Sequence, residues 1–343
     1  MQSKIMKRVL VAAMLGAAVG LAGADPAFAQ TKEAKIAIVA PDADNLGQAM
    51  HTMADYIRRS FPGKFKVDVY AGSTLFTQTQ QIPAMQRGNL EFGLVTMFDI
   101  VPFIPEASIM TAGYLIRDVD HHCSALKTDW GKKVLAQVEE KMNIKIIGQV
   151  LVGFRTLMLR KKKDVKIPAD IANLTMREVP NEAWQFLAEA LGAKPTPIAF
   201  SELYLALQTG TVDAFAGYAT ALKSTKFHEV TEQVVLTNHL VGVDLIGVST
   251  RFWNSLTPHE KAVVMEAGDV ASTFSVKNRV RAEENAIEEL TKELKMTVTT
   301  PNVEAFRKYM KEKYLASKFA KAWPDGLWDM IEKTPSIPNC KMT

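Results

Sequence analysis

The stretch "ALQTGTVDAFAG" (206–217) decides the fold, because it repeats the pattern of "AMQRGNLEFGLV" (84–95) earlier in the chain. Each stretch reads as the end of a helix, a glycine suited to the left-handed turn that follows, and an extended apolar strand. The first helix is expected to end at Gly88. The second is expected to be capped by Ser201 and to end at Gly210. A helix that leads into a strand is common in any α/β protein, but strands of this kind bind ligands at their carboxyl ends. Two such units predict an α/β fold with two similar lobes that face one cleft.

Residues 34–72, which precede the first stretch, also have the pattern of an α/β protein. "AKIAIVA" (34–40) predicts a buried strand, and residues 45–61 have apolar side chains at helical spacing. "GKFKVDVYAG" (63–72) alternates polar and apolar residues as a strand does. Strand, helix and strand in this order open an α/β layer.

The C-terminal third differs. Thr257, Pro258 and Glu260 form a capping box with proline in the first turn, and no further proline occurs before Pro301. Apolar residues recur at helical spacing across this span, with Gly268 as its one weak position. About 37 residues at 1.5 Å each predict a helix of roughly 55 Å, long enough to brace both lobes.

Two apolar segments, 144–153 and 242–250, are expected to be strands that cross between the lobes, because each lies next to a lobe boundary. The predicted division is a first lobe of residues 30–152 with 243–282, and a second lobe of residues 153–242 with 283–343.

Residues 1–29 have the features of a secretory signal peptide. Lys4, Lys7 and Arg8 precede a short apolar run, and a small-x-small site predicts cleavage after Ala29. An uncleaved membrane anchor is the alternative, but the run is short and built mainly of small residues. We therefore expect an exported protein in the periplasm.

The composition is that of an ordinary globular protein of one large or two smaller domains, with 343 residues, 48% hydrophobic and 23% charged. Loss of Lys4, Lys7, Arg8 and Asp25 lowers the formal net charge from +4 to +2. This balance gives no indication of a nucleic-acid partner. The basic run 160–164 has no interleaved aromatic residues and is expected to be a solvated turn.

The two cysteines, Cys123 and Cys340, would meet an oxidising compartment after export. Either they form one disulfide that ties the C-terminal tail to the body, or they remain two unpaired thiols. Their spacing in sequence does not decide between these alternatives.

Five segments in order, all within residues 153–239, resemble the DctP-type solute-binding proteins of TRAP transporters: "GFRTL", "LTMREVP", "LGAKPTPIAFSELYLALQTGTVDA", "KFHEV" and "TNH". The resemblance extends more weakly from Lys35 into the long C-terminal helix. It implies a bilobal periplasmic-binding-protein fold that clamps an organic acid by closure and delivers it to a membrane permease. It implies no cofactor, and we expect a monomer.

Two arginines match the family's carboxylate-binding positions. Arg177, in "TMREVP", matches the arginine that grips the ligand carboxylate, and Arg155, in "GFRTL", matches a second cation nearby. A guanidinium suits this task because its rigid fork presents parallel donors and stays charged at physiological pH. Outside the motif, either arginine would more often form a structural ion pair.

Aromatic residues and one departure from the family suggest the kind of ligand. Phe200 matches a residue whose ring packs against the ligand, or it staples the helix that follows, whereas Trp184 is expected to pack in the core. Where the family commonly has Glu-Asn-Pro, this chain has Ala216, Gly217 and Tyr218, so a ligand-bonding asparagine is missing. With Phe154, Phe215, Met97 and Phe98 near the cleft, we expect a monocarboxylate with an apolar or aromatic body.

The first lobe is expected to contribute polar contacts from Gln78 and Thr96, although both could equally be solvent-facing loop residues. Phe98 follows the same strand end and is assigned to the site with them.

The sequence lacks the usual catalytic motifs: no nucleophile elbow, no His-Glu-x-x-His pair and no phosphate-binding loop. His121 and His122 are adjacent and point in different directions, so a shared metal ion is not expected there. We therefore predict a binding protein and not an enzyme. The alternatives are a C4-dicarboxylate binder of the same family, a receptor that feeds a sensor and, last, an exported hydrolase.

Overall fold

The computed structural model describes residues 31–342. They form one mixed sheet in the order β2-β1-β3-β8-β4-β7-β5-β6, with β9 paired to β8. The strands are β1 Lys32–Ala37, β2 Phe65–Tyr70, β3 Phe92–Val95, β4 Ile144–Leu159, β5 Thr175–Glu178, β6 Lys194–Pro197, β7 Ala214–Tyr218, β8 Gln233–Ser249 and β9 Thr297–Thr299. The predicted signal peptide lies outside the described residues.

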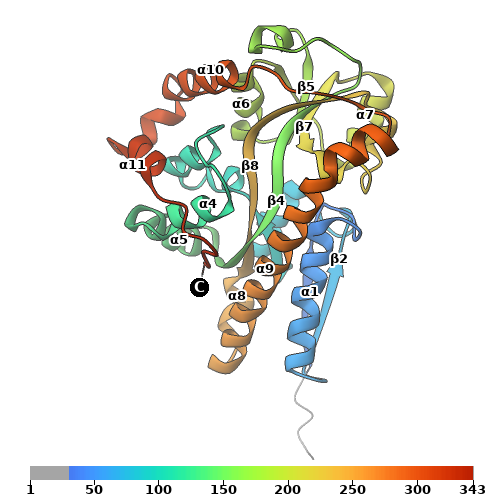
Figure 1. Cartoon of the computed structure of the whole chain (residues 1–343). Coiled ribbons are helices and arrows are strands. Elements are labelled where there is room, and N and C mark those ends of the chain that lie inside the picture. Colours follow the sequence, from blue (N-terminus) through green and yellow to red (C-terminus); the bar gives the residue numbers. More distant parts are fainter. Residues whose placement is uncertain (1–30, 343) are drawn as a thin grey trace, which may run out of the picture.

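Helices cover this sheet and close its ends (Figure 1). They are α1 Asn45–Ser60, α2 Gln78–Gln86, α3 Met97–Ile100, α4 Val119–Lys127, α5 Asp129–Met142, α6 Glu182–Leu191, α7 Leu203–Thr209, α8 Thr250–Asn254, α9 Pro258–Glu288, α10 Val303–Leu315 and α11 Leu327–Lys333.

The two stretches that open the sequence analysis form the same unit twice. α2 leads through Gly88 into β3, and α7 leads through Gly210 into β7. Both glycines have positive φ, of 72° and 79°, which is the left-handed conformation expected after a helix. The cap assigned to Ser201 is wrong. A short 3₁₀ turn, Phe200–Glu202, precedes α7, so Ser201 lies inside this turn.

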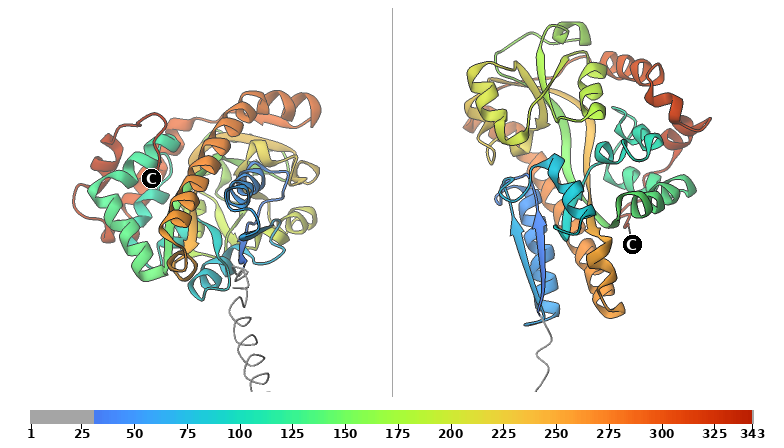
Figure 2. Two further views of the ribbon diagram at one scale, coloured as in Figure 1. Left: turned by 90° about the horizontal axis from the view of Figure 1, so that it is seen from below. Right: turned by 180° about the vertical axis from the view of Figure 1, so that it is seen from behind.

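The crossing strands are β4 and β8, which pair with each other antiparallel along almost their whole length. Figures 1 and 2 show them side by side through the middle of the molecule, with α1 and β2 near one end and β5 and β7 near the other. β3 pairs with the C-terminal half of β8, and β7 pairs with the C-terminal half of β4. Gly153 pairs with Gly242 between these regions. The lobe boundaries at 152/153 and 242/243 coincide with this pair and remain a prediction.

The long C-terminal helix is α9, which begins with the expected capping box of Thr257 and Glu260. A π-helical turn, Glu289–Glu293, continues it. α9 packs against α1 and β4, and also against the short 3₁₀ turn Ala219–Ala221 that follows β7. Gly268 is required by close packing, because a Cβ there would collide with the carbonyl oxygen of Ile147 on β4. The weak position in the helix is thus its contact point with the sheet.

The buried apolar side chains of the described residues fall into three clusters. One joins β1, β2, α1 and α9, and a smaller one joins α7, β7 and the π-helical turn. The largest contains residues of α2 to α6, α10 and α11. The last two helices therefore belong to the body of the protein.

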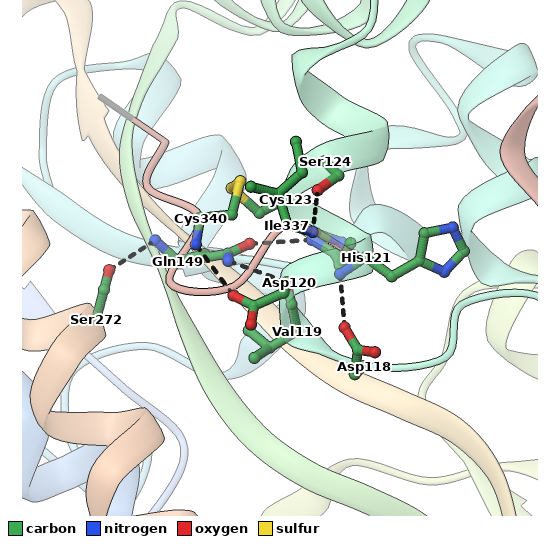
Figure 3. Close-up of a disulfide and its surroundings, with 11 residues drawn as sticks. Asp118, Val119, Asp120, His121, Cys123, Ser124, Gln149, Ser272, Ile337 and Cys340 are labelled. Atoms are coloured by element: carbon green, nitrogen blue, oxygen red, sulfur yellow. Dashed lines mark hydrogen bonds between the residues drawn. A yellow bond between two sulfur atoms is a disulfide. The ribbon is translucent and has the colours of Figure 1, made fainter. Parts of the chain in front are cut away.

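A disulfide joins Cys123 on α4 to Cys340 in the tail that follows α11 (Figure 3). The backbone N–H of Cys340 donates to Asp120 over 3.1 Å, and that of Ile337 donates to the Ser124 hydroxyl over 3.2 Å. Of the two alternatives for the cysteines, the structure has the disulfide.

Candidate functional site

Both sets of parallel strands point their carboxyl ends at one cavity with about 980 Å³ of empty space, its open mouth included. β1 and β3 approach it from the first lobe, and β5 and β7 approach it from the second. The residues assigned to the site from the sequence, apart from Phe98, line this cavity: Gln78, Thr96, Arg155, Arg177, Phe200, Gly217 and Tyr218. Their role in ligand binding remains a prediction.

Arg177 lies on β5, next to β7, and is only 3% exposed. Its Nε–H donates to the carbonyl oxygen of Ile198 over 2.8 Å, which fixes the plane of the guanidinium. Among residues 31–342 its Nη2 has no hydrogen-bond partner. Burial lowers the pKa of Arg177 to about 10, so the group is still charged at neutral pH. A buried, charged side chain that lines a cavity and keeps an unpaired donor is suited to an anion.

Arg155, on β4, has a protein partner already. Its Nη2–H donates to Oε2 of Glu178 over 3.2 Å, and both side chains are buried. Burial raises the pKa of Glu178, against the opposing effect of Arg155 and Arg177. The Arg155 guanidinium also lies 4.4 Å from the centre of the Trp184 ring. Arg155 is therefore held in place, and Arg177 is the freer of the two cations.

Three phenylalanine rings form an apolar wall beside Arg177. Phe227 contacts Phe200 and Phe215 edge to face, with ring centres 5.5 and 5.1 Å apart. The Arg177 guanidinium lies 5.7 Å from the centre of the Phe200 ring. An anion held by Arg177 would thus have its apolar part against aromatic carbon.

Gly217 and Phe215 lie on the same face of β7, which explains the missing asparagine. A Cβ at Gly217 would lie 2.6 Å from the Phe215 ring and 3.1 Å from the sulfur of Met158. The Phe215 ring therefore takes up the space that a side chain at position 217 would need. Tyr218 packs against Gly242 in a similar way, and burial raises its pKa to about 12, so its phenol stays neutral.

Phe98, on α3, lies behind the main cavity. Its ring is stacked on Trp184 of α6, with centres 3.5 Å apart and an interplanar angle of 9°. Both rings border a smaller space of about 320 Å³, together with Met97 and His122. Trp184 is 4% exposed, as expected of a core residue, but it also lines the main cavity. Arg155, Trp184 and Phe98 thus form one continuous stack between β4 and α3.

Thr96 and Gln78 are not solvent-facing loop residues. Thr96 caps α3, and its hydroxyl and backbone N–H both donate to Asp99. The Gln78 side chain also bonds to Asp99, at the start of α2. Burial raises the pKa of Asp99 to about 6. Both side chains line the cavity, and both have protein partners.

The sequence analysis missed two acidic residues in the cavity wall. Asp44 caps α1, accepting a hydrogen bond from Leu46 N–H over 2.9 Å, and lies 3.6 Å from Arg279 of α9. Asp244 lies on β8, and among the described residues its side chain has no hydrogen bond or ion pair. Asp244 could have been found from the sequence. Carboxylates are rarely buried, so an aspartate inside the apolar strand "GVDLIGVST" indicates a special role.

Asp244 makes the stability of the unliganded protein depend on pH. Burial raises its pKa to about 7 from 3.8, and Asp99 and Asp44 raise it further while Arg155 opposes them. Between these pH values the folded state binds a proton that the unfolded state releases, so the unfolding free energy falls as pH rises. His122 and His239, with pKa values lowered by burial to about 4 and about 3, act in the opposite sense until the unfolded-state histidines have lost their protons above about pH 7.5. The contribution of Asp244 is therefore measured as the difference in unfolding free energy between the wild type and Asp244→Asn, which should fall by about 1 kcal/mol between pH 6.5 and 8 in urea unfolding.

Asp244→Asn should remove the Asp244 contribution and raise the unfolding free energy at pH 8. Asp68→Asn, on the exposed edge strand β2, is the matched control and should keep the wild-type dependence. A difference in unfolding free energy between the wild type and Asp244→Asn that is constant from pH 6.5 to 8 would contradict the assignment.

The adjacent residues His121 and His122 have structural hydrogen bonds. Asp118 caps α4 ahead of them, as expected of a helix start. His121 contacts the backbone of Arg117 and Ile331, whereas His122 bonds to Gln149. Across residues 31–342 the structure has no group of three or more His, Cys, Asp or Glu placed to hold a metal ion. In the same residues, no helix is both long and apolar enough to span a membrane.

Comparisons with known proteins agree on one family. The model of the DctP family, described as bacterial extracellular solute-binding protein, family 7, matches residues 36–321. The fold is similar to a TRAP periplasmic solute-binding protein from Roseobacter denitrificans with bound 3-deoxy-D-manno-oct-2-ulosonic acid (30% identity, TM-score 0.83, 89% of this chain and 100% of that one). A protein of the same kind from Polaromonas sp. JS666, bound to D-erythronate, has 26% identity, a TM-score of 0.81 and the same coverage. The sialic acid-binding periplasmic protein SiaP of Vibrio cholerae is 27% identical over 264 residues, 76% of this chain and 81% of that protein.

Proposed function

Because the chain belongs to the DctP family of bacterial extracellular solute-binding proteins, we propose that it is the periplasmic solute-binding subunit of a TRAP transporter. It binds an organic acid and delivers it to the membrane permease, acting as a monomer and without catalysis. The similar proteins of Roseobacter denitrificans and Polaromonas are TRAP solute-binding proteins with organic acids bound.

The ligand carboxylate binds to Arg177. This proposal rests on Arg177, which lines the cavity and whose buried Nη2 has no partner among the described residues. Leaving such a donor unpaired costs about 1–3 kcal/mol, which a carboxylate would recover on binding. Arg155 adds positive charge near the ligand carboxylate. It is not the main donor, because one of its Nη atoms is already bonded to Glu178.

The body of the ligand is apolar or aromatic. Support comes from the wall of Phe200, Phe215 and Phe227 beside Arg177, and from the lack of space for an amide at Gly217. A C4-dicarboxylate is disfavoured, because its second carboxylate would share the cavity with Asp44 and Asp244. Phe98 acts indirectly, by holding Trp184 in the cavity wall.

Ligand binding closes the two lobes around the cavity. The movement is expected at the paired glycines Gly153 and Gly242, where the lobe of residues 30–152 with 243–282 meets that of 153–242 with 283–343. The stack of Phe98 on Trp184 joins α3 to α6 across this boundary and would stabilise the closed state.

The test is thermal melting of the mature protein with a panel of organic acids. At a hundredfold excess over its dissociation constant, a ligand that binds only the folded state adds about 2.7 kcal/mol of stability. We expect the largest shifts from monocarboxylates such as 3-phenylpropanoate and 4-methylpentanoate. A larger shift with succinate would contradict the proposed ligand class, and the absence of any shift across the panel would contradict the assignment to organic acids.

A further inference from the structure

The cavity wall contains one cation and one anion without an ion-pair partner among residues 31–342. Of the charged groups in its wall, Arg155 is paired with Glu178, and Asp44 lies 3.6 Å from Arg279. Among the described residues this leaves Arg177, whose Nη2 has no hydrogen bond, and Asp244, whose carboxylate has neither a hydrogen bond nor an ion pair.

The two unpaired charges are separated within the cavity. Arg177 interacts electrostatically with Glu178 and Arg155, whereas Asp244 interacts with Asp99, Asp44 and Arg155. In the sheet, β4 with Arg155 lies between β8 with Asp244 and β5 with Arg177. The Nε1–H of Trp184, which stacks on Arg155, is another buried cavity-lining donor without a partner in the described part of the chain.

A simple monocarboxylate would satisfy only one of these charges. It would pair with Arg177 and leave the Asp244 carboxylate enclosed by the closing lobes, away from water. An unpaired buried carboxylate is costly, and Asp244 could avoid that cost only by taking up a proton. A ligand that carries its own positive charge at the far end would satisfy both residues.

We propose that the ligand is a zwitterion, with its carboxylate on Arg177 and a protonated nitrogen on Asp244, joined by the apolar body that packs on the phenylalanine wall. This inference rests on the proposed function and narrows its ligand class. The nitrogen would lie beside Asp44 and the ring of Tyr218, which lines the same cavity.

The test is isothermal titration calorimetry with two sets of isosteric acids. The first is 4-ethyl-, 4-(hydroxymethyl)- and 4-(aminomethyl)phenylacetate, and the second is heptanoate, 6-hydroxyhexanoate and 6-aminohexanoate. We expect the amino member of at least one set to bind the wild-type protein at least tenfold more tightly than its alkyl and hydroxyl counterparts. In Asp244→Asn the amino member should lose this advantage, while the alkyl member binds as well as before or better. Asp68→Asn is the control and should keep the wild-type order.

A second measurement follows the proton that Asp244 holds. With its raised pKa, Asp244 is partly protonated at pH 7, so binding of a cation should release a proton. Titrations in two buffers of different ionisation enthalpy should therefore show proton release with the amino member and not with the alkyl member. The titratable or charged groups around Asp244 are Asp44, Asp99, Arg155, Tyr218 and, across the smaller space, His122. Burial raises the pKa of Asp99 to about 6, so this group would also contribute, and Asp99→Asn separates the two.

The outcomes distinguish the inference from the function on which it rests. Alkyl members that bind as tightly as amino members would overturn the zwitterion and leave the monocarboxylate proposal intact. Equal binding of hydroxyl and amino members would also overturn it, because a neutral donor would then suffice. If none of the six acids binds, the proposed ligand class fails, and the inference fails with it.

Discussion

Arg177→Lys is expected to weaken binding of the carboxylate ligand by at least about 30-fold, equivalent to about 2 kcal/mol. The charge is kept, but the planar fork is lost, and lysine cannot both donate to the Ile198 carbonyl and present parallel donors to a carboxylate. Arg177→Ala should cost more, since it also removes the charge that faces Glu178. Calorimetry with the best acid from the melting panel measures both effects.

Arg155 and Arg59 provide the comparisons. Arg155→Lys should mainly lower the unfolding free energy, because it disturbs a buried ion pair with Glu178. Arg59→Lys, on the exposed side of α1, should change neither affinity nor stability. If Arg177→Lys binds the acid as tightly as the wild type, Arg177 does not hold the carboxylate.

Loss of the disulfide is expected to lower the unfolding free energy by about 2–5 kcal/mol. Cys123 and Cys340 are 217 residues apart, so the cross-link restricts nearly two thirds of the unfolded chain. The variant Cys123→Ala with Cys340→Ala should unfold at a lower urea concentration. Ligand affinity should change little, because none of the residues lining the main cavity belongs to α4 or the tail.

Reduction provides the control for this pair. Dithiothreitol should lower the unfolding midpoint of the wild-type protein to that of the double variant and leave the variant unchanged. The tail also has hydrogen bonds that reduction keeps. Ser336 donates to Asp118, and Ile337 N–H donates to Ser124 (Figure 3). Equal midpoints for wild type and variant without reductant would mean that the covalent link adds nothing to these contacts.

Features set by local sequence could be predicted. The turns at Gly88 and Gly210 depend on a conformation that glycine adopts freely, and the capping box of α9 depends on residues three apart. The crossing strands were recognisable because strands buried on both faces are continuously apolar. The grouping of Arg155 and Arg177 around one cavity followed from the family resemblance, since neither arginine alone indicates a ligand.

Features set by packing between distant segments could not be predicted. Asp44 reads as an ordinary helix cap, and only the fold shows that it faces a cavity shared with β5 and β7. The pairing of Arg155 with Glu178 likewise depends on how β4 lies against the strands beside it. Phe98 follows a strand end as a ligand contact would, yet stacking on Trp184 places it behind the cavity wall.

The pairing of β3 with β8 also limits the order in which the chain can fold. β3 lies in the sheet between β1 and β8, so one of its two neighbours is missing until residues 245–248 have left the ribosome. Contacts over such a sequence distance form slowly compared with helices and local turns. The N-terminal half therefore cannot complete its own sheet until β8 has been made. The disulfide comes later still, because Cys340 follows the last helix, α11.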